Sequence, residues 1–135
     1  MRLVFSLLLA TSFCVQAAAL TTVPLKEVRL TDGPFSHSEQ TNLQYLLALD
    51  ADKLLAPLRR EAGIEQKTES YGNWENTGLD GHMLGHYLSA LAFMASATAN
   101  EQIKARLDYL LTELETIQQA QQGYLGGVPG SKACL

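Results

Sequence analysis

The chain has 135 residues, of which 47% are hydrophobic and 18% charged, and this is the composition of a globular protein with room for one ordinary domain. The formal net charge is -4, and only 10 residues are Lys or Arg, so the chain lacks the basic patch that binding to nucleic acid requires. Nucleic acid is therefore excluded as a partner.

Residues 1–19 have the layout of a secretory signal peptide. A basic residue near the start precedes an apolar run, residues 3–13, and small residues follow it. The run is short for a membrane-spanning helix, and the bulky residue before Cys14 disfavours a lipoprotein. We expect cleavage after Ala17 or Ala19, export to the periplasm or the extracellular space, and no membrane contact afterwards.

The two cysteines of the chain are Cys14 and Cys134. Cleavage of the signal peptide would remove Cys14 and leave one cysteine. We therefore expect neither an intramolecular disulfide nor a cysteine-rich zinc site within residues 20–135.

Residues 24–32 predict a short strand closed by a turn. The segment alternates loosely, with Val28 and Leu30 on one side, and it ends at a turn-forming Asp-Gly-Pro sequence. Ser36 and Glu39 then have the spacing of a capping box, and leucines continue from there at helical spacing. We expect a first helix to begin near Ser36.

The first helix is expected to bend or restart between Asp50 and Pro57, because proline lacks an amide hydrogen and clashes with the preceding turn. Gly63 suits the position that follows a helix. No apolar period survives in residues 64–78, which are rich in glycine and asparagine. This segment is predicted to be an ordered loop.

Two further helices and a turn-rich tail are predicted in the rest of the chain. A helix over residues 80–97 has leucines on one face, and His82 and His86 lie on a neighbouring face. Asn100 can cap the next helix, whose apolar stripe continues through Gln121. The tail after it holds four glycines and a proline within eight residues, which excludes another helix.

The end of the predicted loop and the start of the following helix hold the residues that point to function. Tyr71, Trp74 and Glu75 are followed by His82 and His86, and glycines stand beside them. Glycine weakens a helix, and buried Trp, His and Glu side chains each need a polar partner. This mixture is poor for a plain helical core and favours a binding surface.

Trp74 and Glu75 offer the two kinds of contact that a sugar site needs. An indole presents a flat apolar face to the C–H side of a sugar ring, and a carboxylate accepts hydrogen bonds from hydroxyls. The alternative is structural: Trp74 fills the gap between two helices, and Glu75 lies at the N-terminal turn of the second helix, where the dipole favours a carboxylate. The residues alone leave both open.

His82 and His86 are one helical turn apart, so both rings project from one face and could hold a common ligand. Two nitrogens do not make a metal site, and the residues between them lack the glutamate of the His-Glu-X-X-His motif. The alternative is that they are core or capping histidines. Gly81 and Gly85 allow close approach of a second helix or of a substrate, and we favour helix packing.

These segments resemble the N-terminal region of the β-L-arabinofuranosidase-like glycoside hydrolases of family 127 and the related family 146. The resemblance spans roughly residues 25 to 132. It rests on an aromatic-Gly-X-Trp-Glu loop and on further matching segments, which are residues 28–35 (VRLTDGPF), 49–55 (LDADKLL), 81–90 (GHMLGHYLSA) and 123–130 (GYLGGVPG).

The resemblance implies a fold and a substrate. The family fold is an all-α barrel of helix hairpins, an α/α toroid with sugar bound at the loops on one end, and this chain would supply its first hairpins. The implied activity is retaining hydrolysis of terminal β-L-arabinofuranosyl linkages in plant-derived glycans, so carbohydrate is the expected partner. The implied substrate-binding residues are Tyr71, Trp74, Glu75, His82 and His86.

The resemblance also implies a cysteine nucleophile held by zinc, with further cysteines and a glutamate downstream of the matched region. The chain has no adjacent cysteine pair and no Glu-X-Cys, and the surroundings of Cys134 do not match, so no catalytic residue is assigned. Glu75 and Asp80 would form a conventional carboxylate pair, but the resemblance argues against that mechanism. We expect residues 20–135 to be a truncated N-terminal part of a catalytic domain, inactive alone and without a cofactor of its own.

Two other readings stay open. The chain could be a non-catalytic carbohydrate-binding or helical interaction module, or a purely structural helical domain in which Trp74 and both histidines serve packing. A sugar that changes the fluorescence of Trp74 would separate the binding readings from the structural one.

Overall fold

The computed structural model describes residues 20–134 and shows four α-helices and three short 3-10 helices. The predicted signal peptide, residues 1–19, lies outside the described residues. The α-helices are α1 (Pro34–Ala48), α2 (Ala51–Glu61), α3 (His82–Thr98) and α4 (Glu101–Ala120). The 3-10 helices are η1 (Leu25–Glu27), η2 (Asn73–Glu75) and η3 (Ser131–Cys134).

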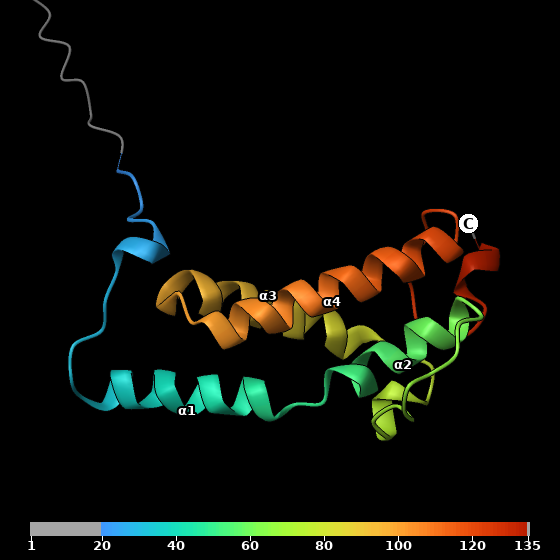
Figure 1. Cartoon of the computed structure of the whole chain (residues 1–135), viewed down its shortest axis with the longest axis horizontal. Helices are drawn as coiled ribbons and strands as arrows, with labels where there is room; N and C mark the ends of the chain where they lie inside the picture. Colours follow the sequence, from blue (N-terminus) through green and yellow to red (C-terminus); the bar gives the residue numbers. More distant parts are fainter. Residues whose placement is uncertain (1–19, 135) are drawn as a thin grey trace, which may run out of the picture.

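The helices pack as two pairs. Helices α1 and α2 follow one another along one side of the molecule, and the antiparallel hairpin of α3 and α4 packs against both of them (Figure 1). Each helix thereby buries an apolar face against its neighbours. The prediction of an all-α fold is confirmed for residues 20–134. None of the helices in this described part is long and apolar enough to cross a membrane.

The predicted N-terminal strand over residues 24–32 is wrong. Part of this segment forms η1, and no strand occurs anywhere in residues 20–134. A strand needs a partner for its backbone groups, and the rest of the described chain offers only helices and loops. The alternation of Val28 and Leu30 therefore has no sheet to join.

Helix α1 begins two residues earlier than predicted, at Pro34. Proline suits the first turn of a helix, because its missing N–H would have no partner there. Gly33 is the N-cap and no side chain caps this end, so the capping box predicted for Ser36 and Glu39 does not form. Both residues lie inside the helix instead.

The break between α1 and α2 occurs at Asp50 and not at Pro57. The Asp50 carboxylate caps α2 by accepting hydrogen bonds from the amides of Asp52, at 3.0 Å, and Lys53, at 3.4 Å. Pro57 is buried inside α2. Gly63 follows this helix in a left-handed conformation, with φ +69. Its amide donates a hydrogen bond to the Arg60 carbonyl, and the Ile64 amide donates one to the Arg59 carbonyl. This pair of hydrogen bonds is a Schellman motif.

Helix α3 and helix α4 match their predicted extents closely. Asn100 caps α4, as predicted, by accepting 3.0 Å hydrogen bonds from the amides of Gln102 and Ile103. At the start of α3, Gly81 is the N-cap in a left-handed conformation, with φ +86. Only glycine adopts that conformation without strain.

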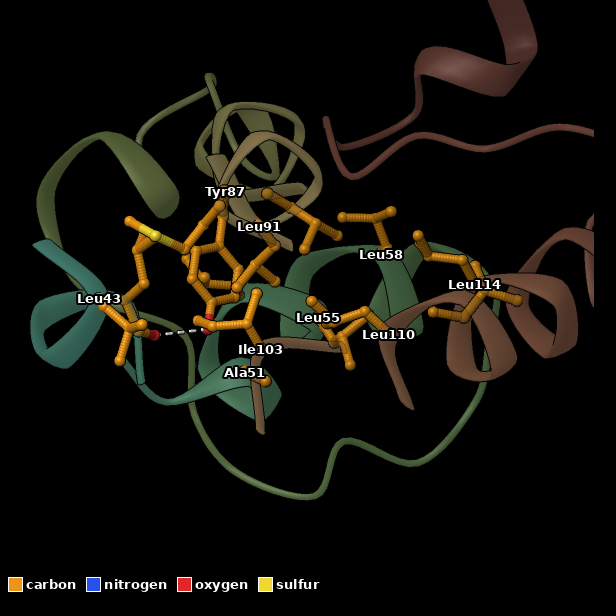
Figure 2. Packing of buried hydrophobic residues seen from close by; sticks show 14 residues of the cluster. Leu43, Ala51, Leu55, Leu58, Tyr87, Leu91, Ile103, Leu110 and Leu114 are labelled. Atoms are coloured by element: carbon orange, nitrogen blue, oxygen red, sulfur yellow. Dashed lines mark hydrogen bonds between the residues drawn. The ribbon is translucent and has the colours of Figure 1, made fainter. Parts of the chain in front are cut away.

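The core lies where all four helices meet. Figure 2 shows Leu55 of α2, Leu91 of α3 and Leu110 of α4 packed side by side, and all three are fully buried. Tyr87 is buried among them, and its hydroxyl donates a 2.7 Å hydrogen bond to the Leu46 carbonyl of α1. This bond satisfies a polar group that burial would otherwise penalise.

Candidate functional site

A pocket of about 600 Å³ opens beside η2 and the first turns of α3. All five residues predicted to bind substrate line it, namely Tyr71, Trp74, Glu75, His82 and His86. Side chains from α1 and α2 complete it, including Asn42, Tyr45, Leu46 and Leu54. We refer to this cavity as the Trp74 pocket.

Glu75 lines the Trp74 pocket and is only 3% exposed. One carboxylate oxygen accepts a hydrogen bond from the Gly81 amide at 2.9 Å, and the other accepts one from the Met83 amide at 3.1 Å. These are amides of the first turn of α3 that have no partner within the helix. Glu75 therefore stabilises the start of α3 and ties η2 to it, as the structural alternative expects.

His82 stands between Glu75 and the open part of the pocket. Its Nδ1 lies 2.8 Å from the Leu79 carbonyl oxygen and 2.7 Å from a carboxylate oxygen of Glu75. Neither a carbonyl nor a carboxylate donates a hydrogen bond, so the surroundings of Nδ1 favour a proton on this nitrogen. Any hydrogen bond from this ring to a ligand must then use Nε2.

Three rings follow one another along the pocket. The Trp74 and His82 ring centroids are 5.9 Å apart with the planes tilted by 43°, and the His82 and His86 centroids are 6.4 Å apart, edge to face. Trp74 is 66% exposed, so it is not the packing residue that the structural reading required. The two neighbouring side chains therefore differ in exposure. Trp74 is exposed to solvent, whereas Glu75 is buried.

Tyr71 is held at the rim by its hydroxyl, which accepts a 2.9 Å hydrogen bond from the Asp50 amide. Lys53 lies over its ring, with Nζ 5.3 Å from the centroid. The ring is therefore fixed at the junction of α1 and α2, and its contribution to the pocket is an apolar surface.

Sequence reasoning missed the α1 side of the pocket. Asn42 and Tyr45 are exposed on α1 and line the cavity opposite the motif residues. Nothing in their spacing distinguishes them from ordinary surface positions of a helix. Only the packing of α1 against α3, which brings together segments some forty residues apart in sequence, makes them part of the site.

Asp80 does not face the Trp74 pocket. It is buried, and Oδ1 accepts a 2.6 Å hydrogen bond from Arg60 while Oδ2 accepts a 2.9 Å hydrogen bond from the Gly78 amide. Burial by itself raises the pKa of the Asp80 carboxyl, but the hydrogen bonds from Arg60 and Gly78 outweigh it and hold the pKa below its ordinary value. The geometry gives Glu75 and Asp80 no shared place at which a substrate could be cleaved.

Gly81, the N-cap of α3, and Gly85 within α3 have different surroundings. A Cβ on Gly81 would lie 2.7 Å from Leu58 Cδ1 and 3.3 Å from the Cα of Gly127 in the tail. Apart from its chain neighbours and the backbone of α3 itself, Gly85 has no described heavy atom within 4 Å of such a position. Close packing is therefore found at Gly81, against α2 and the tail, and the packing of a second helix predicted at Gly85 is not observed.

Comparison with known protein families decides the family of the chain. The family described as Beta-L-arabinofuranosidase, GH127 catalytic domain, matches residues 27–134. The chain belongs to this family. The match includes η2, α3 and every residue of the Trp74 pocket. Membership of a glycoside hydrolase family implies a carbohydrate substrate. No curated protein matches the chain.

The zinc that the resemblance to GH127 implies does not fit the residues described. Within residues 20–134, no three His, Cys, Asp or Glu side chains are grouped so that they could hold a metal ion. In the Trp74 pocket, Nδ1 of His82 lies against two hydrogen-bond acceptors, and both oxygens of Glu75 accept amide hydrogen bonds. A catalytic zinc usually has three protein ligands, and the side chains that line the pocket leave only ring nitrogens of His82 and His86 for that role, so we derive no step through a metal at this pocket.

Proposed function

We propose that the Trp74 pocket binds a terminal β-L-arabinofuranosyl residue of a plant-type glycan, in a hydrolase that is exported from the cell. The observation that carries this proposal is the exposed Trp74 ring beside His82 and His86 in a cavity of about 600 Å³. Sugar sites combine an aromatic face with a few polar groups that fix orientation. The family assignment supports carbohydrate as the ligand.

The contacts differ in kind around the pocket. Trp74 offers its face to the C–H side of a furanose ring, and Nε2 of His82 accepts a hydrogen bond from a hydroxyl when the imidazole is neutral. His86 and Asn42 supply further polar atoms on facing helices. Glu75 contributes indirectly, because its oxygens accept hydrogen bonds from α3 amides.

We further propose that these residues bind sugar without cleaving it. The described residues that line the pocket include no cysteine, and the carboxylate of Glu75 is interred. A retaining mechanism requires a nucleophile and an acid close to the anomeric carbon. Neither is supplied by the side chains around Trp74.

Two measurements test the proposal. Titration with methyl β-L-arabinofuranoside should change the fluorescence of Trp74, the only tryptophan, whereas methyl β-D-glucopyranoside should have a smaller effect. An aryl β-L-arabinofuranoside should show no turnover by the chain. Turnover that is abolished by His86→Ala would contradict the proposed lack of catalysis, and a fluorescence signal that ignores the arabinofuranoside would contradict sugar binding.

A helical interaction module is the second candidate, and exposed aromatic side chains favour it. Phe35 of α1 and Phe93 of α3 are both more than half exposed, and neither lines the Trp74 pocket. Exposed apolar groups of this size are frequent where another protein surface binds. This candidate predicts that Phe35→Ser and Phe93→Ser weaken association with a partner domain, while the fluorescence of Trp74 is insensitive to sugars.

A further inference from the structure

Glu75 touches two structures at once, the first turn of α3 and the ring of His82. Its oxygens accept hydrogen bonds from the amides of Gly81 and Met83, and the oxygen that serves Met83 also lies 2.7 Å from Nδ1 of His82. Glu75 is buried, whereas the side chain of His82 is 30% exposed. A buried acceptor therefore stands behind a ring that reaches the pocket surface.

The neighbours of Nδ1 determine which nitrogen of His82 holds the proton. The Leu79 carbonyl is the hydrogen-bond partner of Nδ1, at 2.8 Å. A lone pair on Nδ1 would face both this carbonyl and the Glu75 carboxylate and would be repelled by both, whereas a proton there is attracted by both. In the neutral ring, Nε2 is then left as an acceptor.

We propose that Glu75 is a positioning residue for ligand recognition by His82. It keeps the His82 ring in the Nδ1–H form, with the help of the Leu79 carbonyl, so that Nε2 accepts a hydrogen bond from a sugar hydroxyl. It also ties η2, which carries Trp74, to α3, because the same carboxylate accepts hydrogen bonds from the amides of Gly81 and Met83. The proposal of Nε2 as the contact atom rests on the proposed function, whereas the proton position does not.

The Nδ1–H form can be read directly from the nitrogen NMR signals of the histidine rings in the whole chain. In its neutral form, the His82 ring should show one protonated nitrogen, Nδ1, and a signal for Nε2 typical of an acceptor. His37 on α1 is exposed and serves as the reference histidine. Assignment uses His82→Gln. A His82 ring protonated at Nε2, or an exchanging mixture like that of His37, would overturn the proposal.

Glu75→Gln tests the part played by the carboxylate, because the amide keeps the size of the side chain and removes its charge. The Nδ1 proton should exchange faster with water than in the original chain, and the affinity for methyl β-L-arabinofuranoside should fall about tenfold. Asp50→Asn is the control, since Asp50 caps α2 without touching a histidine. Circular dichroism reports whether each variant keeps its helices.

The outcomes separate the two proposals. If Glu75→Gln folds with unchanged proton exchange and sugar affinity, the positioning role of Glu75 is wrong although the pocket binds sugar. If Glu75→Gln does not fold, the ring signals of the original chain still decide the proton position. If His82 is in the Nδ1–H form but Nε2 does not respond to the arabinofuranoside, it is the proposed function that fails.

Discussion

Arg60 of α2 donates a 2.6 Å hydrogen bond to Asp80, which lies just before α3 and is 4% exposed. The same Asp80 carboxylate accepts a hydrogen bond from the Gly78 amide. One buried carboxylate thus joins α2 to the loop that carries Trp74. The Trp74 pocket depends on this junction because η2 and the start of α3 form one of its sides.

The Arg60–Asp80 pair predicts a loss of stability in acid. Burial raises the pKa of Asp80, but Arg60 and Gly78 together lower it below the ordinary value of 3.8. The stabilisation that ionised Asp80 gives to the folded state is therefore fully present above about pH 3.8, and it is lost as the pH falls through the pKa of Asp80 in the folded state. Urea unfolding measured between pH 2 and pH 7 should show the decline at the lower end of this range.

Asp80→Asn should remove this decline and lower the free energy of unfolding at pH 7 by about 1–2 kcal/mol, since Arg60 is partly exposed and water screens the charge. Asp108→Asn, at an exposed position of α4, is the control and should change stability little. If Asp80→Asn shows the same decline in acid as the original chain, the pair is not its cause.

Gly127 lies where the tail packs closely against the helices, and a larger side chain there should lower stability. A Cβ at this position would lie 2.9 Å from the Asp80 carbonyl, 3.0 Å from Leu58 Cδ1 and 3.1 Å from Pro57 Cβ. Gly127→Ala should therefore lower the free energy of unfolding by about 1–3 kcal/mol. Gly72→Ala has no heavy atom within 4 Å of the new Cβ and should be close to neutral in the same urea titration. Equal stability of the two variants would contradict close packing of the tail.

Local signals in the sequence were sufficient where a single side chain or glycine decides the backbone. Asn100 caps α4 and Gly63 ends α2, and both follow from the chemistry of caps. The predictions of a capping box at Ser36 and of a strand over residues 24–32 were wrong. A capping box needs a helix that starts after Ser36, and a strand needs a second strand with which to pair. A helix began at Pro34 before Ser36 could cap it, and no second strand lies in the described chain.

The site shows the same limit at the level of packing. The motif residues could be proposed from their types and spacing together with the resemblance to family 127, and they do line one cavity. The different exposure of Trp74 and Glu75 could not be predicted in this way, because it depends on which of two neighbouring side chains turns toward the protein interior. Asn42 and Tyr45 carry no motif and enter the pocket only through the contact between α1 and α3.

Arg106 of α4 holds the C-terminal end of α1, and its substitution tests how much this contact stabilises the protein. Its guanidinium donates hydrogen bonds to the carbonyls of Leu49, at 2.7 Å, and Leu47, at 3.3 Å, and to the Tyr87 hydroxyl at 3.1 Å. These carbonyls lie at or next to the C-terminal end of α1, where the helix supplies no partner. Arg106→Met keeps most of the apolar stem and should cost about 1–2 kcal/mol in thermal or urea unfolding. Lys104→Met, at an exposed position on the same helix, should cost less than 0.5 kcal/mol.

Exposed aromatic side chains on α1 and α3 predict binding of a hydrophobic dye. Phe35, Tyr45 and Phe93 are all more than half exposed. The chain should therefore enhance the fluorescence of anilinonaphthalene sulfonate, because these apolar side chains lie on its surface. The double variant Phe35→Ser, Phe93→Ser should reduce the dye signal. Absence of dye binding would contradict this expectation.

Trp74 provides the most direct separation of ligand binding from stability. Because its side chain is largely exposed, Trp74→Ala should change the free energy of unfolding by less than about 0.5 kcal/mol. It should nevertheless weaken the binding of methyl β-L-arabinofuranoside about tenfold, because the aromatic face of the pocket is lost. Calorimetric titration measures the affinity without relying on tryptophan fluorescence. Phe93→Ala removes an equally exposed aromatic ring of α3 that lies outside the Trp74 pocket, and it should leave the affinity unchanged. Equal losses in the two variants would show that the effect comes from general surface hydrophobicity and not from the face that Trp74 presents to a sugar.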